Sequence, residues 1–262
     1  MNLLFLGTGA ADTDMNLFQP SINFRRNSSA LINDDLLIDP GPHIFHYAEC
    51  NGRNDLFDNV KNIIVTHSHK DHFNPENFRR IYEKTGCTLW SDKACIRRLT
   101  EAFGEEFANS INYVETSPLQ TYDIGNYKVS SLYSNHATPD QDEITRIYYI
   151  TDGERNLFYG CDSSWIPTRS WNFIKEKPIN TLVLELTCGD LASDDWRLFE
   201  HNTIEMLELM LRMFRKFNRF APDVKFYTSH MAVTLHKPHA DIVERLVPMG
   251  VTPAYDGLEI EI

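Results

Sequence analysis

Short apolar runs bounded by polar turn residues recur along the whole chain, and this pattern is typical of buried β-strands. The runs predict strands over residues 3–6, 28–32, 36–38, 62–65, 88–90, 112–115, 128–133, 145–151, 156–159, 181–186, 224–227 and 258–260. Segments with helical spacing of apolar residues predict helices over residues 77–84, 92–103, 204–217 and 239–246. Strands interleaved with helices along one chain indicate an α/β fold.

A histidine-rich turn follows the strand predicted at 62–65. His67 and His69 are two residues apart on an extended segment, so their side chains point the same way and can hold one ion together. Asp71 and His72 come after the chain has turned and can reach a second ion. Imidazole and carboxylate are ligands of zinc and similar divalent ions. The alternative is a polar surface turn that happens to contain histidines, but this density directly after an apolar strand favours a metal site.

Three more side chains that can bind metals stand just past predicted strands: His136, Asp162 and His230. Taken alone, each would more often be a hydrogen-bonded surface or core residue. Sites in α/β sheets form outside the carboxyl ends of strands, so together with His67 these residues predict one shared site. Asp39 also ends a strand, and we expect it to support a ligating histidine or to cap the turn, with direct ligation as a third option.

The chain has 262 residues, of which 42% are hydrophobic, and we expect one domain over 1–262 with a sizeable core. Its formal net charge of −12 works against non-specific binding to nucleic acid, although a local basic patch is compatible with it. Five scattered cysteines with no CxxC pair fit a reducing compartment, so we expect a cytoplasmic protein. No signal peptide and no membrane-spanning stretch are predicted.

The turn resembles the HxHxDH marker of the metallo-β-lactamase fold superfamily, and the later strand-end residues match its other ligands. This resemblance implies a four-layer αββα sandwich of two mixed β-sheets flanked by helices. It also implies two divalent metal ions per chain, with zinc favoured and manganese or iron as alternatives. The implied ligands are His67, His69 and His136 for the first ion, Asp71, His72 and His230 for the second, and Asp162 bridging both.

The segment His201-Asn202-Thr203 is similar to a His-Ser-Thr or His-x-Thr element of ribonuclease Z and of cyclic-phosphate phosphodiesterases. In those enzymes the histidine lies over the metal centre and assists departure of the leaving group. The resemblance therefore implies that His201 acts as a general acid. The alternative is a structural histidine at the start of a helix, with Asn202 as the cap.

We therefore expect a metal-dependent hydrolase that attacks a small phosphodiester or nucleotide, cyclic ones included. Asp71 and His201 are the expected catalytic residues, with Asp71 guiding a proton of the water shared by the ions. Many β-lactamases carry a cysteine where this chain has Asp162, which weighs against β-lactamase activity. The excess of acidic over basic residues weighs against a transfer RNA substrate. Lactone or thioester hydrolysis and a non-catalytic carrier role are the alternatives. A homodimer is compatible with the sequence.

Overall fold

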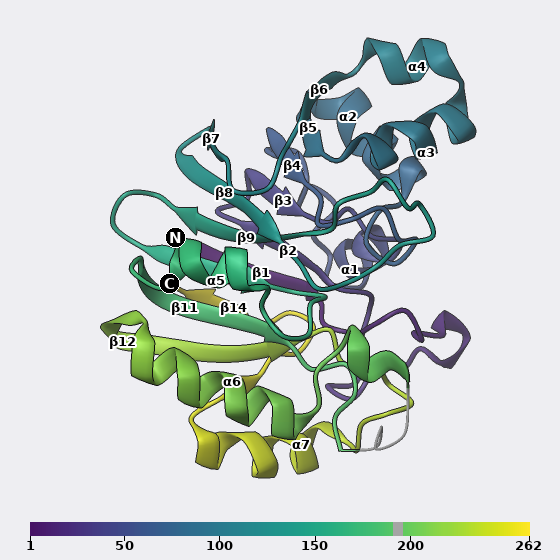
Figure 1. Cartoon of the computed structure of the whole chain (residues 1–262). Coiled ribbons are helices and arrows are strands. Elements are labelled where there is room, and N and C mark those ends of the chain that lie inside the picture. The colour runs from purple at the N-terminus through teal and green to yellow at the C-terminus, as the bar shows by residue number, and fades with distance from the viewer. Residues whose placement is uncertain (191–195) are drawn as a thin grey trace.

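The computed structural model describes residues 1–190 and 196–262. In these residues two seven-stranded sheets lie face to face, and helices cover the outer face of each sheet (Figure 1). The αββα sandwich expected from the sequence is confirmed. Both chain ends lie together because the first and last strands pair with each other.

The first sheet is mixed and has the order β14-β1-β2-β3-β4-β5-β6. Its strands are β14 (Glu259–Glu261), β1 (Asn2–Gly7), β2 (Ser29–Ile32), β3 (Leu36–Ile38), β4 (Asn62–Ile64), β5 (Thr88–Ser91) and β6 (Asn112–Glu115). Strands β3 to β6 are parallel, and β1 runs in the same direction because β2 is antiparallel to both of its neighbours. The carboxyl ends of β1, β3 and β4 therefore meet at one edge.

The second sheet has the order β13-β12-β11-β10-β9-β8-β7. Its strands are β13 (Thr252–Pro253), β12 (Arg219–Ser229), β11 (Pro178–Glu185), β10 (Asn156–Gly160), β9 (Arg146–Thr151), β8 (Tyr127–Tyr133) and β7 (Thr121–Ile124). Strands β10 to β13 are parallel, and β8 shares their direction because β9 is antiparallel to both β8 and β10. The ends of β8, β10, β11 and β12 therefore open onto one edge of this sheet.

The apolar runs are unbroken because both faces of the strands are buried. In β1, Leu3 and Phe5 pack between the two sheets, whereas Leu4 and Leu6 face the outer helices. The interior strand β11 divides its side chains in the same way, with Val183 between the sheets. This double burial fixes the register of each strand and holds the strand ends in place.

Helices α1 (Ile44–Cys50), α2 (Pro75–Thr85), α3 (Lys93–Phe103) and α4 (Glu105–Ser110) cover the first sheet. Helices α5 (Thr168–Ile174), α6 (Ile204–Phe217) and α7 (His239–Leu246) cover the second. Short 3₁₀ turns η1 (Met15–Leu17), η2 (Trp196–Phe199) and η3 (Val247–Met249) complete the described elements. None of the helices in the described ranges has the length and apolar character needed to cross a bilayer.

Several short elements were not predicted from the sequence: α1, α4, α5, β7 and β13. Helices α1 and α5 have no side-chain cap, so the usual start signal is missing. The interpretation of Asn202 as the cap of α6 is wrong. The Thr203 side chain accepts the hydrogen bond from Met206 N, while Asn202 is buried and donates to the carbonyl oxygens of Ser163 and Glu185.

Candidate metal centre

The loops after β4, β8, β10 and β12 bring the residues predicted from the sequence into one cluster. His67 follows β4 in the first sheet, while His136, Asp162 and His230 follow strands of the second sheet. The site therefore lies where the carboxyl ends of strands from both sheets come together. Two groups of donor atoms, each with a span within 4.8 Å, contain all of the predicted ligands: His67, His69, His136 and Asp162 in one, and Asp71, His72 and His230 in the other.

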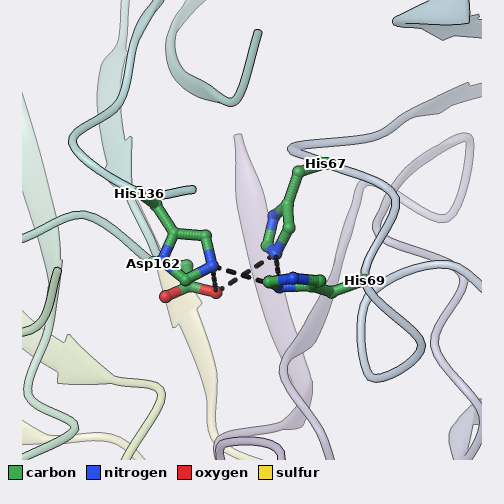
Figure 2. Close-up of side chains that lie close together, drawn as sticks. All are labelled: His67, His69, His136 and Asp162. Atoms are coloured by element: carbon green, nitrogen blue, oxygen red, sulfur yellow. Dashed lines mark hydrogen bonds and ion pairs between the residues drawn. The ribbon is translucent and has the colours of Figure 1, made fainter. Parts of the chain in front are cut away.

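The first group is shown in Figure 2, where four side chains from three loops point at one another. Nδ1 of His69 lies 2.9 Å from Nε2 of His67 and 3.1 Å from Nε2 of His136. Oδ2 of Asp162 lies 3.3 Å from Nε2 of His67 and 3.4 Å from Nε2 of His136. Three imidazole nitrogens and one carboxylate oxygen thus face a common centre.

The second group lies directly beside the first. Nε2 of His72 is 3.2 Å from Nε2 of His230 and 3.4 Å from Oδ2 of Asp71. Oδ2 of Asp71 is in turn 3.7 Å from Nε2 of His230. The same oxygen of Asp162 that faces the first group is 3.2 Å from Nε2 of His72 and 3.5 Å from Nε2 of His230. One carboxylate oxygen is therefore shared between both groups.

These separations fit donors arranged around metal ions. Ligand bonds of ~2.0–2.1 Å in tetrahedral geometry place neighbouring donor atoms roughly 3.3 Å apart. The distances of 2.9–3.7 Å between the donors fall around this value. Imidazole and carboxylate donors together suit zinc and related divalent ions. Both groups of side chains are thus suited to binding divalent metal ions.

Two of the histidines face carboxylates with their other ring nitrogen. Nδ1 of His72 lies 2.9 Å from Oδ2 of the buried Asp39. Nδ1 of His136 lies 3.2 Å from Oε2 of Glu200. A proton held on Nδ1 leaves the Nε2 lone pair for a metal, and it fixes the orientation of the ring. Asp39 thus contacts a predicted ligand, as one of the sequence interpretations had it.

Two further histidines, His67 and His230, are held by matching threonine–carboxylate pairs. Thr66 donates its amide and its hydroxyl to Asp39, at 2.7 and 2.8 Å, and the hydroxyl lies 3.0 Å from Nδ1 of His67. Thr187 donates its amide and its hydroxyl to Glu185, and the hydroxyl lies 2.8 Å from Nδ1 of His230. Because each hydroxyl has only one proton, the imidazole must be the donor to it, which again leaves Nε2 free.

Residues at three strand ends adopt left-handed backbone conformations. The φ angles are 58° at Asp39, 56° at Asp162 and 54° at His230. Aspartate and histidine tolerate this region better than most residues, but it still carries strain. Each of these three residues aims its side chain toward the cluster, and the surrounding hydrogen bonds hold its conformation.

The crowded charges shift several pKa values. Burial and the neighbouring imidazole of His136 lower the pKa of His69 to about 4. Burial alone would raise the pKa of Asp162, but the surrounding histidines hold it well below its ordinary value. A neutral imidazole beside an ionised carboxylate is the protonation state that metal binding requires. His201 behaves differently, since the Asp162 carboxylate outweighs the effect of burial and raises the histidine pKa to about 11.

His201 lies over the two groups of donors. Its Nδ1 is 3.1 Å from Oδ1 of Asp162, the oxygen that does not face the other imidazoles, and its ring stacks on His230 at 5.7 Å. The side chain lines a pocket of about 500 Å³ that also exposes His69, Asp71 and His136. A ligand in this pocket would touch both the donor groups and His201.

The HxHxDH turn is clamped from two sides. Ser68, between the first two histidines, donates from its amide and its hydroxyl to the carboxylate of Glu143, both at 2.7 Å. Arg98 of α3 donates to the carbonyl oxygens of Ser68 and Phe73. These contacts hold His67 and His69 on the same side of the turn.

Sequence reasoning missed the supporting residues Thr187, Glu185, Glu200 and Glu143. A signal existed for one of them, because Glu185 is the charged residue within the apolar run 181–186 and is fully buried. A charge in a buried strand must be paired, which marks it as part of a polar site. Glu143 and Glu200 lie in polar segments, where nothing in the sequence separates them from ordinary surface residues.

The fold and the site define a metallo-β-lactamase fold protein with clustered histidine and aspartate donors. The family model described as beta-lactamase superfamily domain matches residues 35–242, and the chain belongs to this family. No curated protein sequence matches the chain.

Solved structures with the same fold cover the whole chain. A diphosphatase of the PhnP family is 19% identical, with a TM-score of 0.74 over 100% of this chain and 97% of that one. Zn²⁺-bound PqqB from Methylobacterium extorquens is 14% identical, with a TM-score of 0.76 over 100% of both chains. The short form of human tRNase Z is 17% identical, with a TM-score of 0.69 over 100% of this chain and 99% of that one. At these identities the likeness establishes the fold alone.

Proposed function

We propose that this chain is a two-metal hydrolase that cleaves small phosphodiesters. The observation that carries the proposal is the position of Oδ2 of Asp162, within 3.2–3.5 Å of the Nε2 atoms of four histidines in two adjacent donor groups. An acidic oxygen in this position suits a bridge between two cations. The proposed ligands are His67, His69 and His136 for one ion, Asp71, His72 and His230 for the other, and Asp162 for both.

Two bound ions would supply a water nucleophile of lowered pKa and stabilise charge that develops on phosphoryl oxygens. The chain's own residues supply the proton steps. His201 lines the pocket beside Asp162, and we assign it the role of the general acid that donates a proton to the leaving oxygen. Asp71 also lines the pocket and is placed to orient the proton of the attacking water.

The relatives support this reaction class. The PhnP-family structure is named a diphosphatase and the human structure a tRNase Z, and both names denote enzymes that cleave phosphate esters or anhydrides. The PqqB structure is named as Zn²⁺-bound, which favours zinc among the divalent ions that this donor set suits. The formal net charge of −12 favours a small substrate over a nucleic acid.

The replacement Asp162→Ala tests the shared oxygen. We expect the zinc-reconstituted wild type to hold two ions per chain and to hydrolyse bis-p-nitrophenyl phosphate. The variant should lose metal and lose turnover, because both ions lose a ligand. Asp142→Ala is the matched control, since Asp142 is exposed and lies outside both donor groups. A variant that keeps two ions and full activity would defeat the proposal, and so would a wild type that cleaves lactones or thioesters but no phosphodiester.

The replacement His201→Ala tests the general acid. A nitrophenolate leaves without a proton, whereas an alkoxide needs one. We expect the variant to retain its metal and to slow hydrolysis of alkyl phosphodiesters far more than that of nitrophenyl esters. Equal slowing of both substrates, or loss of metal, would show that His201 acts as a ligand or a structural residue instead.

A further inference from the structure

The pocket over the donor groups is lined by residues of different character. Small residues line it, among them Ala10, Ala137 and Pro139. The 3₁₀ turn η2 contributes Trp196 and Arg197. The volume of about 500 Å³ exceeds what a bare phosphate group would fill and lies within the usual range for small-molecule sites, ~300–1,000 Å³. The pocket therefore has room for a second part of the substrate beside the phosphodiester.

Trp196 is 68% exposed although it lines this pocket. Tryptophan side chains are on average highly buried, because their large apolar rings gain much from leaving water. A tryptophan presented at the mouth of a pocket offers a flat surface on which an aromatic ligand can stack. Phe199 of the same turn is 80% exposed but is not among the residues that line the pocket.

The turn that carries Trp196 is firmly attached to the site. The carbonyl oxygen of Phe199 accepts hydrogen bonds from the side chains of Asn135 and Ser164, which follow β8 and β10. Ser164 N donates to the carbonyl oxygen of Glu200, at 2.9 Å. Because the same loops carry His136 and Asp162, the position of η2 is fixed relative to the donor groups.

Charged side chains of both signs line the pocket. Among the described residues that line the pocket, Arg197 is the only lysine or arginine. The two carboxylates of the lining outside the donor groups have partners of their own. Asp12 accepts hydrogen bonds from Val233 N and Thr234 N, and Glu200 faces Nδ1 of His136. Arg197 follows Trp196 directly in η2, and both residues line the pocket.

We propose that Trp196 is a specificity-determining residue that stacks on the base of a nucleotide, so that the preferred substrates are nucleoside phosphodiesters. This inference rests on the proposed function. The phosphodiester would lie over the donor groups, and the base would cover the exposed indole. The overall acidity and the limited volume favour a mononucleotide over a polymer.

The test compares two esters with the same leaving group, thymidine 5′-p-nitrophenyl phosphate and methyl p-nitrophenyl phosphate. Stacking of one base on an aromatic side chain stabilises the bound ligand. In Trp196→Ala the loss of this stacking should lower kcat/KM for the thymidine ester at least ~5-fold, chiefly by raising KM. The methyl ester should be cleaved as by wild type. Trp196→Phe should restore most of the loss, and the matched control Phe199→Ala should resemble wild type with both esters.

Equal losses with both esters, or no loss with either, would overturn the stacking role. A binding experiment separates this failure from failure of the proposed function. If the zinc-loaded wild type cleaves neither ester, calorimetry still compares AMP with ribose 5-phosphate. Tighter binding of AMP that disappears in Trp196→Ala supports the base surface without any turnover. Equal binding of the two ligands by wild type refutes it.

Discussion

Replacing Thr187 with valine removes one hydroxyl from the support of His230 and preserves the shape of the side chain. Thr187, Glu185 and His230 are all buried, at 3%, 0% and 2% exposure. In the variant, Nδ1 of His230 loses its acceptor at 2.8 Å, while Glu185 keeps the amide of residue 187 at 2.7 Å. One buried donor is then unpaired, which costs about 1–3 kcal/mol.

Two measurements follow from this replacement. Urea unfolding of the metal-free protein should show a stability loss of about 1–3 kcal/mol. Competition with a chelator should show metal affinity weakened ~10–100-fold, as is typical when the partner of a ligating histidine is removed. The affinity falls because the proton of His230 is no longer held on Nδ1, so Nε2 is less often free for the ion.

Thr181→Val is the matched control. Thr181 is also a fully buried threonine of β11, but its hydroxyl has no hydrogen-bond partner within the described residues. Its replacement should leave metal affinity unchanged and should not lower stability. If Thr187→Val bound metal as tightly as wild type, or if both variants weakened it equally, the inferred orientation of His230 would be wrong.

Three further outcomes are expected. Glu143→Ala should weaken metal binding ~10-fold by freeing Ser68, whereas the exposed Asp142→Ala should not, as chelator competition would show. Removing the metals should lower the free energy of unfolding by about 2.7 kcal/mol for each ion bound, relative to protein in a hundredfold excess of free zinc over the Kd of that ion. Urea unfolding measures this loss, and an unchanged midpoint would contradict a native-state metal site. In the metal-free protein the pKa of His201 is raised to about 11, so protonated His201 stabilises the fold. This contribution to the free energy of unfolding is complete below pH ~6.5 and is lost as the pH rises to about 11. The free energy of unfolding of His201→Gln should therefore decline less across this range.

Much of the fold was predictable because the strands are buried on both faces. Such strands leave short unbroken apolar runs, and β1, β10 and β11 are found within two or three residues of their predicted limits. Strand β12 was predicted too short, since its first part, 219–223, contains a proline and two charged residues and is partly exposed. The helix at α2 was predicted over 77–84 and extends over Pro75–Thr85, with Asn74 as the cap and Pro75 in the first turn.

The clustering of the proposed ligands also followed from strand ends, because the carboxyl ends of similarly directed strands share one edge. Which atoms face the centre did not follow. The choice of Nδ1 for His69 and Nε2 for the other histidines depends on contacts such as Thr187 with His230, between residues far apart in the chain. The exposure of Trp196 at the pocket is likewise a property of the assembled structure, since its sequence neighbours give no sign of it.

X-ray absorption spectroscopy of the zinc-loaded protein, combined with metal counting, tests the paired site most directly. We predict two ions per chain, a zinc–zinc distance of ~3.5–4 Å and a coordination shell of nitrogen and oxygen donors. A single ion per chain without a second metal nearby, or an unchanged zinc–zinc signal in Asp162→Ala, would contradict the shared carboxylate.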